Sequence, residues 1–166
     1  MPASPTLLKI RDATPGDIPS IIALERAAAS AAHWTESQYQ ALFSPSMSGV
    51  QNLILLAEAA SSKPHLANQP SLLGFLVARR ISPEWELENI VVAPASQRTR
   101  IGRQLLKALL DKARQTNSES VFLEVRDSNT AARAFYEKSG FRQVGHRKSY
   151  YQGPVEDALL YRFDLR

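Results

Sequence analysis

The sequence contains no cysteine, and this absence excludes several kinds of chemistry. Disulfide bonds, thiolate zinc sites and a cysteine nucleophile are all ruled out. The three histidines, His33, His65 and His146, are isolated and lack the spacing of metal ligands, so we expect no metal. No apolar run approaches the length of a membrane span, and the first residues lack the charged and apolar regions of a signal peptide. We therefore expect a cytoplasmic protein that does not enter a membrane.

Motifs for nucleotide and nucleic-acid binding are also missing. The Walker pattern, the dinucleotide glycine fingerprint, zinc fingers, basic zippers and aromatic RNA-binding signatures are all absent. The formal net charge is +4 and the isoelectric point about 9.6, but basic and acidic residues are interleaved along most of the chain. This pattern favours an anionic ligand and no nucleic acid. A basic nucleic-acid-binding domain is the alternative that the charge leaves open.

The chain has the length and composition of one ordinary domain, with 166 residues of which 44% are hydrophobic. We expect a single domain over residues 1–166, with residues 1–6 disordered and a mobile surface loop at 60–70. Thr35 with Gln38 resembles a capping box, and Gly140 is placed to end a helix. Strands are expected at 7–11, 50–58, 72–79, 85–92, 120–126, 142–148 and 158–165, and helices at 18–32, 35–42, 101–113 and 130–139.

In the strand expected at 120–126, side chains alternate between two faces, and one of them is a carboxylate among apolar residues. Val121, Leu123 and Val125 point to one face, and Glu124 points to the other from a largely apolar strand. Asn129, which can cap the following helix, recurs at helical spacing with Arg133 and Tyr136. We therefore expect Glu124 and Tyr136 to face one cleft. The same alternation in residues 85–92 places Glu86 and Glu88 on the face of Ile90 and Val92.

A basic turn links the strand at 85–92 to a strongly amphipathic helix that begins at Ile101. Free backbone N–H groups and the positive end of the helix dipole converge at such a turn and bind anions. Residues 97–102, Gln-Arg-Thr-Arg-Ile-Gly, could therefore hold a pyrophosphate. A solvated helix start, in which the arginines only add solubility, is the alternative.

Two segments carry a resemblance to a known family. Residues 97–102 resemble the Gln/Arg-x-x-Gly-x-Gly/Ala loop of the GNAT superfamily of acetyl-CoA-dependent N-acetyltransferases, and residues 129–141 resemble its Asn-x-x-Ala-x-x-x-Tyr-x-x-x-Gly-Phe segment. The run at 123–129, the pair Tyr150 and Tyr151, and the segment 33–36 resemble the RimI-like ribosomal-protein alanine N-acetyltransferases. One departure is Arg100, which stands where the loop has its first glycine. We expect Arg100 to keep an ordinary backbone conformation and to add a guanidinium contact to the phosphates.

The resemblance implies an α/β (α+β) fold: a mixed seven-stranded sheet with helices on both faces, whose fourth and fifth strands splay apart to admit the pantetheine arm. It implies acetyl-CoA as cosubstrate, with a backbone N–H near Ile90 polarising the thioester carbonyl. The implied cofactor-binding residues are Ile90, Val91, Val92, Gln97, Arg98, Thr99, Arg100, Ile101, Gly102, Arg103, Asn129 and Tyr136. The residues assigned to acceptor binding are His33, Trp34, Glu86, Glu88, Tyr150 and Tyr151.

Glu124 and Tyr136 match the base and acid positions of the family. A base is less demanding for an α-amino group, with a reference pKa of about 8, than for a lysine at about 10.4. Alternatives stay open: Glu124 as a structural partner of Arg126 or Arg133, Glu86 or Glu88 as the base, and Tyr136 as core packing. No acyl-enzyme is expected, because cysteine is absent.

The resemblance thus implies direct acetyl transfer to the N-terminal α-amino group of a peptide or protein, with a ribosomal protein as one candidate acceptor. Alternatives are a small amine or a lysine side chain as acceptor, and a CoA-binding module without turnover. We expect a monomer or homodimer.

Overall fold

The computed structural model describes residues 7–28, 32–60 and 72–166. The described residues form a seven-stranded sheet in the order β1-β2-β3-β4-β5-β7-β6, antiparallel except for β4 and β5. The strands are β1 (Leu8–Asp12), β2 (Gln51–Ala59), β3 (Leu72–Ile81), β4 (Glu84–Val92), β5 (Ser120–Arg126), β6 (Arg142–Tyr151) and β7 (Glu156–Asp164). The helices are α1 (Ile18–Ala27), α2 (Glu36–Leu42), α3 (Ile101–Gln115) and α4 (Thr130–Lys138), with short 3₁₀ turns η1 (Pro15–Asp17) and η3 (Pro94–Ser96).

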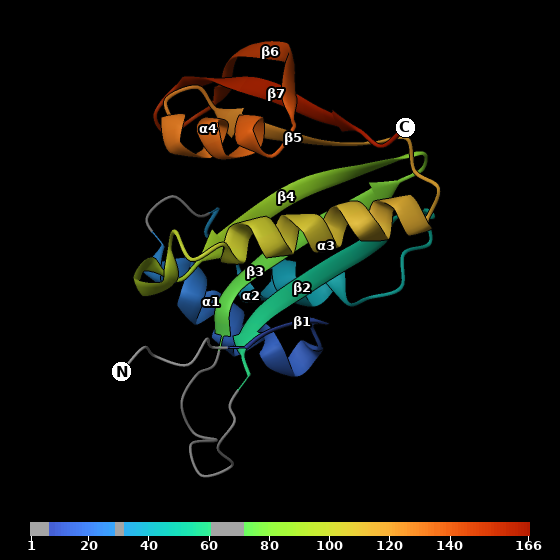
Figure 1. Ribbon diagram of the computed structural model, residues 1–166, viewed down its shortest axis with the longest axis vertical. Coiled ribbons are helices and arrows are strands. Elements are labelled where there is room, and N and C mark those ends of the chain that lie inside the picture. Colours follow the sequence, from blue (N-terminus) through green and yellow to red (C-terminus); the bar gives the residue numbers. More distant parts are fainter. Residues whose placement is uncertain (1–6, 29–31, 61–71) are drawn as a thin grey trace.

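Helices cover both faces of the sheet, as predicted (Figure 1). α3 crosses one face of β2 to β4, α1 and α2 lie behind that sheet, and α4 packs with β5 and β7. Two buried clusters follow from the alternation of each strand. In β2, for example, Leu55 joins the cluster under α3 and α4, while Leu56 joins the cluster under α1 and α2.

The local signals for the helices are confirmed, with one exception. Thr35 and Gln38 form the capping box of α2, and the apolar residues of the amphipathic helix α3 from Ile101 to Ala113 face the core. Gly140, at φ +96°, follows α4 as predicted. The first helix is shorter than predicted: it ends at Ala27, because Ala28 is already extended. The predictions for residues 1–6 and for most of the loop at 60–70 fall outside the described residues.

β4 and β5 are paired over only part of their length. Their register runs from Glu84 opposite Ser120 to Leu87 opposite Leu123, and no pair between these strands follows in the described structure. The backbone of β4 after Leu87 therefore has an edge toward β5 that β5 does not occupy. This is the predicted splaying of the fourth and fifth strands, and it sets the position of the candidate site.

A β-bulge in β4 corrects one prediction. Asn89 pairs with Val77, but the next partner, Ala78, pairs with Leu87, so Glu88 is an extra residue in β4. The bulge shifts the alternation by one. Ile90 and Val92 consequently pack on the α3 side, whereas Glu86 lies opposite Arg79 on the other face. The expectation that Glu86 and Glu88 share a face with Ile90 and Val92 is wrong.

Candidate active site

The turn ahead of α3 presents a group of free backbone N–H groups. Gln104 is the first helical residue whose N–H donates back to the turn, 3.0 Å from the carbonyl oxygen of Arg100, and the N–H groups of Ile101, Gly102 and Arg103 donate to no described residue. Successive N–H groups in such a turn, added to the helix dipole, favour an anion. The geometry therefore suits the phosphate binding predicted for residues 97–103.

Arg100 takes the backbone conformation of the glycine that it replaces. Its φ is +70° and its ψ is 5°, in the left-handed region, and it serves as the N-cap of α3. The expectation of an ordinary conformation at Arg100 is therefore wrong. A residue with a Cβ pays a steric cost in this conformation that glycine does not.

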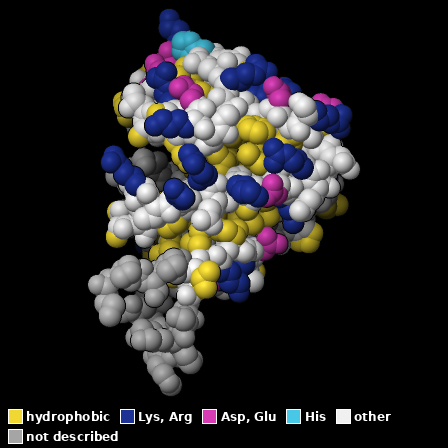
Figure 2. Space-filling model, in the orientation of Figure 1, with side chains coloured by type: hydrophobic (Ala, Val, Ile, Leu, Met, Phe, Trp, Pro, Cys, Tyr) yellow, Lys and Arg dark blue, Asp and Glu magenta, His cyan; other side chains and the backbone are white. Residues whose placement is uncertain are grey.

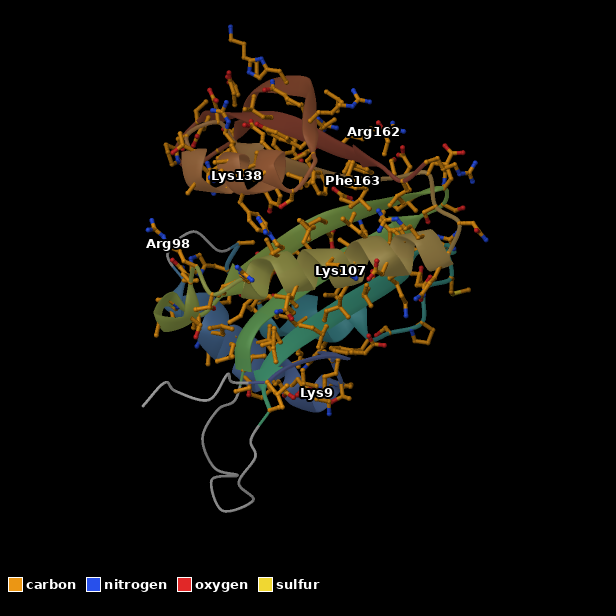
Figure 3. All side chains as sticks on the ribbon, viewed as in Figure 1. Lys9, Arg98, Lys107, Lys138, Arg162 and Phe163 are labelled. Atoms are coloured by element: carbon orange, nitrogen blue, oxygen red, sulfur yellow. The ribbon has the colours of Figure 1, made fainter. Side chains whose placement is uncertain are left out.

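Basic side chains surround this turn. Figure 3 shows Arg98 on the turn, Lys107 on the exposed side of α3 and Lys138 on α4, and Figure 2 shows Lys and Arg side chains spread over the same face. Lys107 is paired with Asp111 at 2.5 Å. The face is thus positive overall around the N-terminus of α3, which is the charge that a diphosphate requires.

Gly102 brings three elements of the site close together. A Cβ at Gly102 would lie 3.5 Å from Cζ of Phe135 on α4 and 3.6 Å from Cγ2 of Val92 on β4. The first turn of α3 therefore sits directly against the end of the free β4 edge. Ile90, Val91 and Val92 all lie on this edge, after the last pair between β4 and β5.

Glu124 lies on β5 just after the last β4–β5 pair. Its side chain is 14% exposed, and its Oε1 lies 3.2 Å from Nε of Arg147 on β6. The partners suggested from the sequence, Arg126 and Arg133, instead pair with Glu156 and Asp127. Glu124 is therefore a carboxylate at the strand opening that Arg147 holds.

Tyr136 and Glu124 lie on opposite faces of β5. Tyr136 belongs to the cluster under α3 and α4, together with Leu123 and Val125, whereas Glu124 alternates with those residues. Burial, with a smaller contribution from Tyr151, raises the pKa of Tyr136 above its ordinary value. The Tyr136 hydroxyl donates no hydrogen bond to a described residue, although no buried oxygen in the described structure lacks a partner. The hydroxyl oxygen is therefore not fully enclosed, although the Tyr136 side chain as a whole is buried.

Tyr151 lies near both Tyr136 and Glu124. Burial chiefly raises its pKa, and the next contribution comes from the nearby Glu124 carboxylate. The guanidinium of Arg126 lies 4.1 Å from the centre of the Tyr151 ring. The Tyr150 ring packs edge-on against the Tyr151 ring, with 5.2 Å between the two ring centres. Sequence reasoning identified the tyrosine pair but not its place between the expected acid and the expected base.

The end of β6 is kinked where these tyrosines begin. Ser149 has a φ of +52°, and its N–H donates to Oδ1 of Asp157 at 2.7 Å. Oδ2 of the same carboxylate lies 2.7 Å from Nε2 of His146. The nearby Glu124 carboxylate is the main cause of the raised pKa of Tyr150. The kink therefore directs Tyr150 back toward the carboxylate.

Glu86 and Glu88 share one cation. Nη2 of Arg79 lies 2.7 Å from Oε2 of Glu86, and its Nε lies 3.2 Å from Oε1 of Glu88. Burial raises the pKa of Glu88, and the charge of Arg79 opposes that shift. Both carboxylates are thus committed to an ion pair on the face opposite α3.

The remaining predicted residues have mixed placements. The side-chain oxygen of Asn129 caps α4 by accepting from the N–H of Ala132 at 3.1 Å, so only its amide nitrogen is free for a ligand. His33 is exposed, and Trp34 is half-buried against Tyr39 ahead of α2. Trp34 therefore borders the same sheet face as Glu86.

The sequence of residues 28–141 matches the acetyltransferase (GNAT) family. This chain belongs to the GNAT family. Its fold, with the parallel pair β4 and β5 opening beyond Leu87, agrees with that membership. Members of this family are acetyltransferases, and they use acetyl-CoA as cosubstrate.

Several relatives of this GNAT protein carry a more specific name. The N-alpha-acetyltransferase RimI of Mycobacterium tuberculosis is 47% identical over 81 residues, which is 49% of this chain and 49% of that protein. The [ribosomal protein bS18]-alanine N-acetyltransferase of Escherichia coli K12 is 37% identical over 97 residues, covering 57% of this chain and 66% of that protein. The matched segment thus spans between about half and two thirds of these curated relatives.

Solved structures resemble this GNAT protein over nearly its whole length. The crystal structure of the ribosomal-protein-S18-alanine N-acetyltransferase from Escherichia coli has a TM-score of 0.77 at 26% identity, covering 96% of this chain and 94% of that one. Ard1 from Thermoplasma volcanium has a TM-score of 0.77 at 25% identity, covering 95% and 97%.

No helix in the described part of this GNAT protein is long and apolar enough to cross a membrane.

Proposed function

We propose that this GNAT protein transfers the acetyl group of acetyl-CoA to the N-terminal α-amino group of a peptide or protein. One observation carries the proposal: the β4–β5 pairing ends at Leu87 and Leu123, and Glu124 lies on β5 directly after the last pair. The relatives named RimI and ribosomal protein bS18-alanine N-acetyltransferase support an N-terminal acceptor.

Acetyl-CoA supplies the acetyl thioester, and the residues present fit it. The free N–H groups ahead of and within the first turn of α3 suit the diphosphate, and Arg98, Arg100 and Arg103 add positive charge. The unpaired edge of residues 90–92 suits the amide groups of an extended pantetheine arm, which can bond to it as a further strand would. The Asn129 amide nitrogen is left free for the same ligand.

Glu124 is proposed as the base. The acceptor must attack as a neutral amine, and Glu124 takes the proton that the amine gives up, directly or through one water. A new C–N bond forms as the C–S bond breaks, so the sulfur leaves with an electron pair. Tyr136 is proposed to donate its hydroxyl proton to that sulfur. Glu124 thus accepts the proton from the amine, and Tyr136, on the other face of β5, donates a proton to the sulfur.

The α-amino group suits this site better than a lysine does. Neutral pH lies about 1 unit below the reference pKa of an α-amino group, which is about 8, but about 3 units below that of lysine. Deprotonating the α-amino group therefore costs less. A carboxylate, with a reference pKa of about 4.3, is a weak base, so the amine that loses its proton more readily suits Glu124 better. We assign His33, Trp34, Glu86, Glu88, Tyr150 and Tyr151 to the acceptor side, and a ribosomal protein N-terminus in the cytoplasm is the proposed partner.

The test is CoA release from acetyl-CoA with short peptides that differ in their first residue. The control is a peptide with an acetylated N-terminus and an internal lysine. Turnover that requires a free N-terminus is expected. Turnover of the control peptide at an equal rate would overturn the N-terminal assignment and indicate lysine. Turnover of small amines alone would indicate a small-molecule acceptor, and binding of acetyl-CoA without any turnover would indicate a binding module.

A further inference from the structure

A carboxylate is buried beneath the segment that leads into α2. Glu25, on α1, is 1% exposed, and its hydrogen bonds with described residues all come from uncharged donors. Burying a carboxylate is costly unless its oxygens are satisfied. The carboxylate of Glu25 therefore serves here as a hydrogen-bond acceptor, which an apolar side chain could not do.

Each oxygen of Glu25 holds a different part of the fold. Oε2 accepts the backbone N–H of Trp34 at 3.0 Å, ahead of α2. Oε1 accepts the hydroxyl of Tyr39 on α2 at 2.9 Å and the side-chain N–H of Asn89 on β4 at 3.0 Å. Burial and the bond to Glu25 raise the pKa of Tyr39, so its hydroxyl stays protonated and donates.

The two ends of this network lie at the candidate site. Asn89 directly follows the bulge at Glu88 and precedes the free edge at 90–92. Trp34, whose ring centre is 5.4 Å from that of Tyr39, is one of the residues assigned to the acceptor. Glu25 thus links Trp34, which we assign to the acceptor side, to the part of β4 that precedes the free edge.

We propose that Glu25 is a positioning residue for the acceptor: it fixes Trp34 and the start of α2 against the bulged part of β4. The inference rests on the proposed peptide acetylation. Losing the bond to Trp34 loosens the acceptor side while the N-terminus of α3, on the other face of the sheet, is unaffected. The acceptor and acetyl-CoA should therefore respond differently to a change at Glu25.

Glu25→Gln tests the two carboxylate oxygens of Glu25 separately. Glutamine can keep one acceptor for Tyr39 and Asn89, but its amide nitrogen then faces the N–H of Trp34, donor against donor. We expect the KM of the acceptor peptide to rise about tenfold, the loss of one hydrogen bond to a charged group, with kcat and the KM of acetyl-CoA changed less than about twofold. Glu58→Gln is the matched control, because Glu58 pairs with Arg11 away from Trp34, and it should leave both KM values unchanged.

Amide hydrogen exchange gives a readout that needs no turnover. In the unmodified protein the Trp34 amide should exchange at least about tenfold more slowly than that of exposed His33, and Glu25→Gln should remove this protection. Tyr39→Phe removes a donor to Oε1 only, so the Trp34 amide should stay protected. A peptide panel without turnover would reject the proposed function and leave the exchange result standing.

Two results would overturn the positioning role. One is an unprotected Trp34 amide in the unmodified protein, a measurement that holds even if Glu25→Gln does not fold. The other is a Glu25→Gln variant whose acceptor KM is unchanged, or whose two KM values rise together.

Discussion

Arg147 on β6 holds Glu124 on β5 from across β7, with Nε 3.2 Å from Oε1. Arg147 lies on β6, two residues before the kink at Ser149. The carboxylate proposed as the base is therefore oriented by the last strands of the chain. An acceptor ammonium that approaches Glu124 meets a carboxylate that already has one cationic partner, so the acceptor and Arg147 share it.

Replacing Glu124 tests its role as base. Glu124→Gln keeps the shape and removes the proton acceptor, and we expect kcat to fall by about 100-fold or more while the acetyl-CoA-induced rise in melting temperature persists. Glu84→Gln is the control, because Glu84 lies on β4 and accepts a hydrogen bond from Ser120 at 2.9 Å. An unchanged rate in Glu124→Gln would shift the role of base to Glu86 or Glu88.

Tyr136→Phe tests the proton donor. The hydroxyl makes no hydrogen bond to a described residue, so its removal should change the free energy of unfolding by less than about 0.5 kcal/mol. Turnover should fall by about 100-fold. Tyr161→Phe gives the opposite pattern, because the Tyr161 hydroxyl donates to Glu137 at 2.7 Å. It should destabilise the fold by about 1 kcal/mol and spare turnover. Equal rates for Tyr136→Phe and the unmodified protein would remove Tyr136 from the chemistry.

Arg100→Gly separates backbone strain from charge. Glycine accepts a φ of +70° without a Cβ clash, so we expect the variant to be more stable by about 1 kcal/mol in urea unfolding. Arg100→Ala keeps the Cβ and should not gain stability. Both variants lose the guanidinium and should weaken acetyl-CoA binding by the same factor, measured by calorimetry. A tighter complex in either variant would argue against a phosphate contact from Arg100.

Asp17 should make stability depend on pH. Hydrogen bonds from Arg11, at 2.8 and 2.9 Å, are the main cause that holds the pKa of Asp17 well below its ordinary value of 3.8. A lowered pKa in the folded state adds stability that is complete above about pH 4 and is lost as the pH falls.

Asp17→Asn should therefore cost about 2 kcal/mol at pH 7 and progressively less below pH 4, as measured by urea unfolding. Asp111→Asn, in an exposed pair with Lys107, should cost less than about 0.5 kcal/mol at either pH. A loss for Asp17→Asn that did not vary with pH would exclude the linkage.

Local patterns predicted most of the fold, because they depend on residues close in sequence. The period of two in β5 placed Glu124 opposite Leu123, and the capping box at Thr35 marked the start of α2. The bulge at Glu88 gave no such signal. Trp85, Leu87, Asn89 and Val91 are all buried in regular alternation, and only the pairing with β3 reveals that the faces exchange.

The site was harder to predict where partners are distant in sequence. Arg147 reaches Glu124 only because β7 and β6 follow β5 in the sheet. Glu25 reads as a solvated helix residue, since nothing near it indicates that Asn89 will lie beside it. The left-handed conformation of Arg100 is likewise imposed by the tertiary setting and is disfavoured by the residue itself.

The extra residue at Glu88 gives one position of β4 an unusual tolerance to change in chain length. Leu87 pairs with Ala78 and Asn89 pairs with Val77, so removing Glu88 alone would leave two consecutive pairs of a regular ladder and keep Ile90 and Val92 on the α3 side. A one-residue deletion within the regularly paired part of the strand would instead turn every residue on one side of it to the other face. In laboratory evolution of this chain, loss of a residue should therefore be tolerated better at position 88 than at its neighbours in β4.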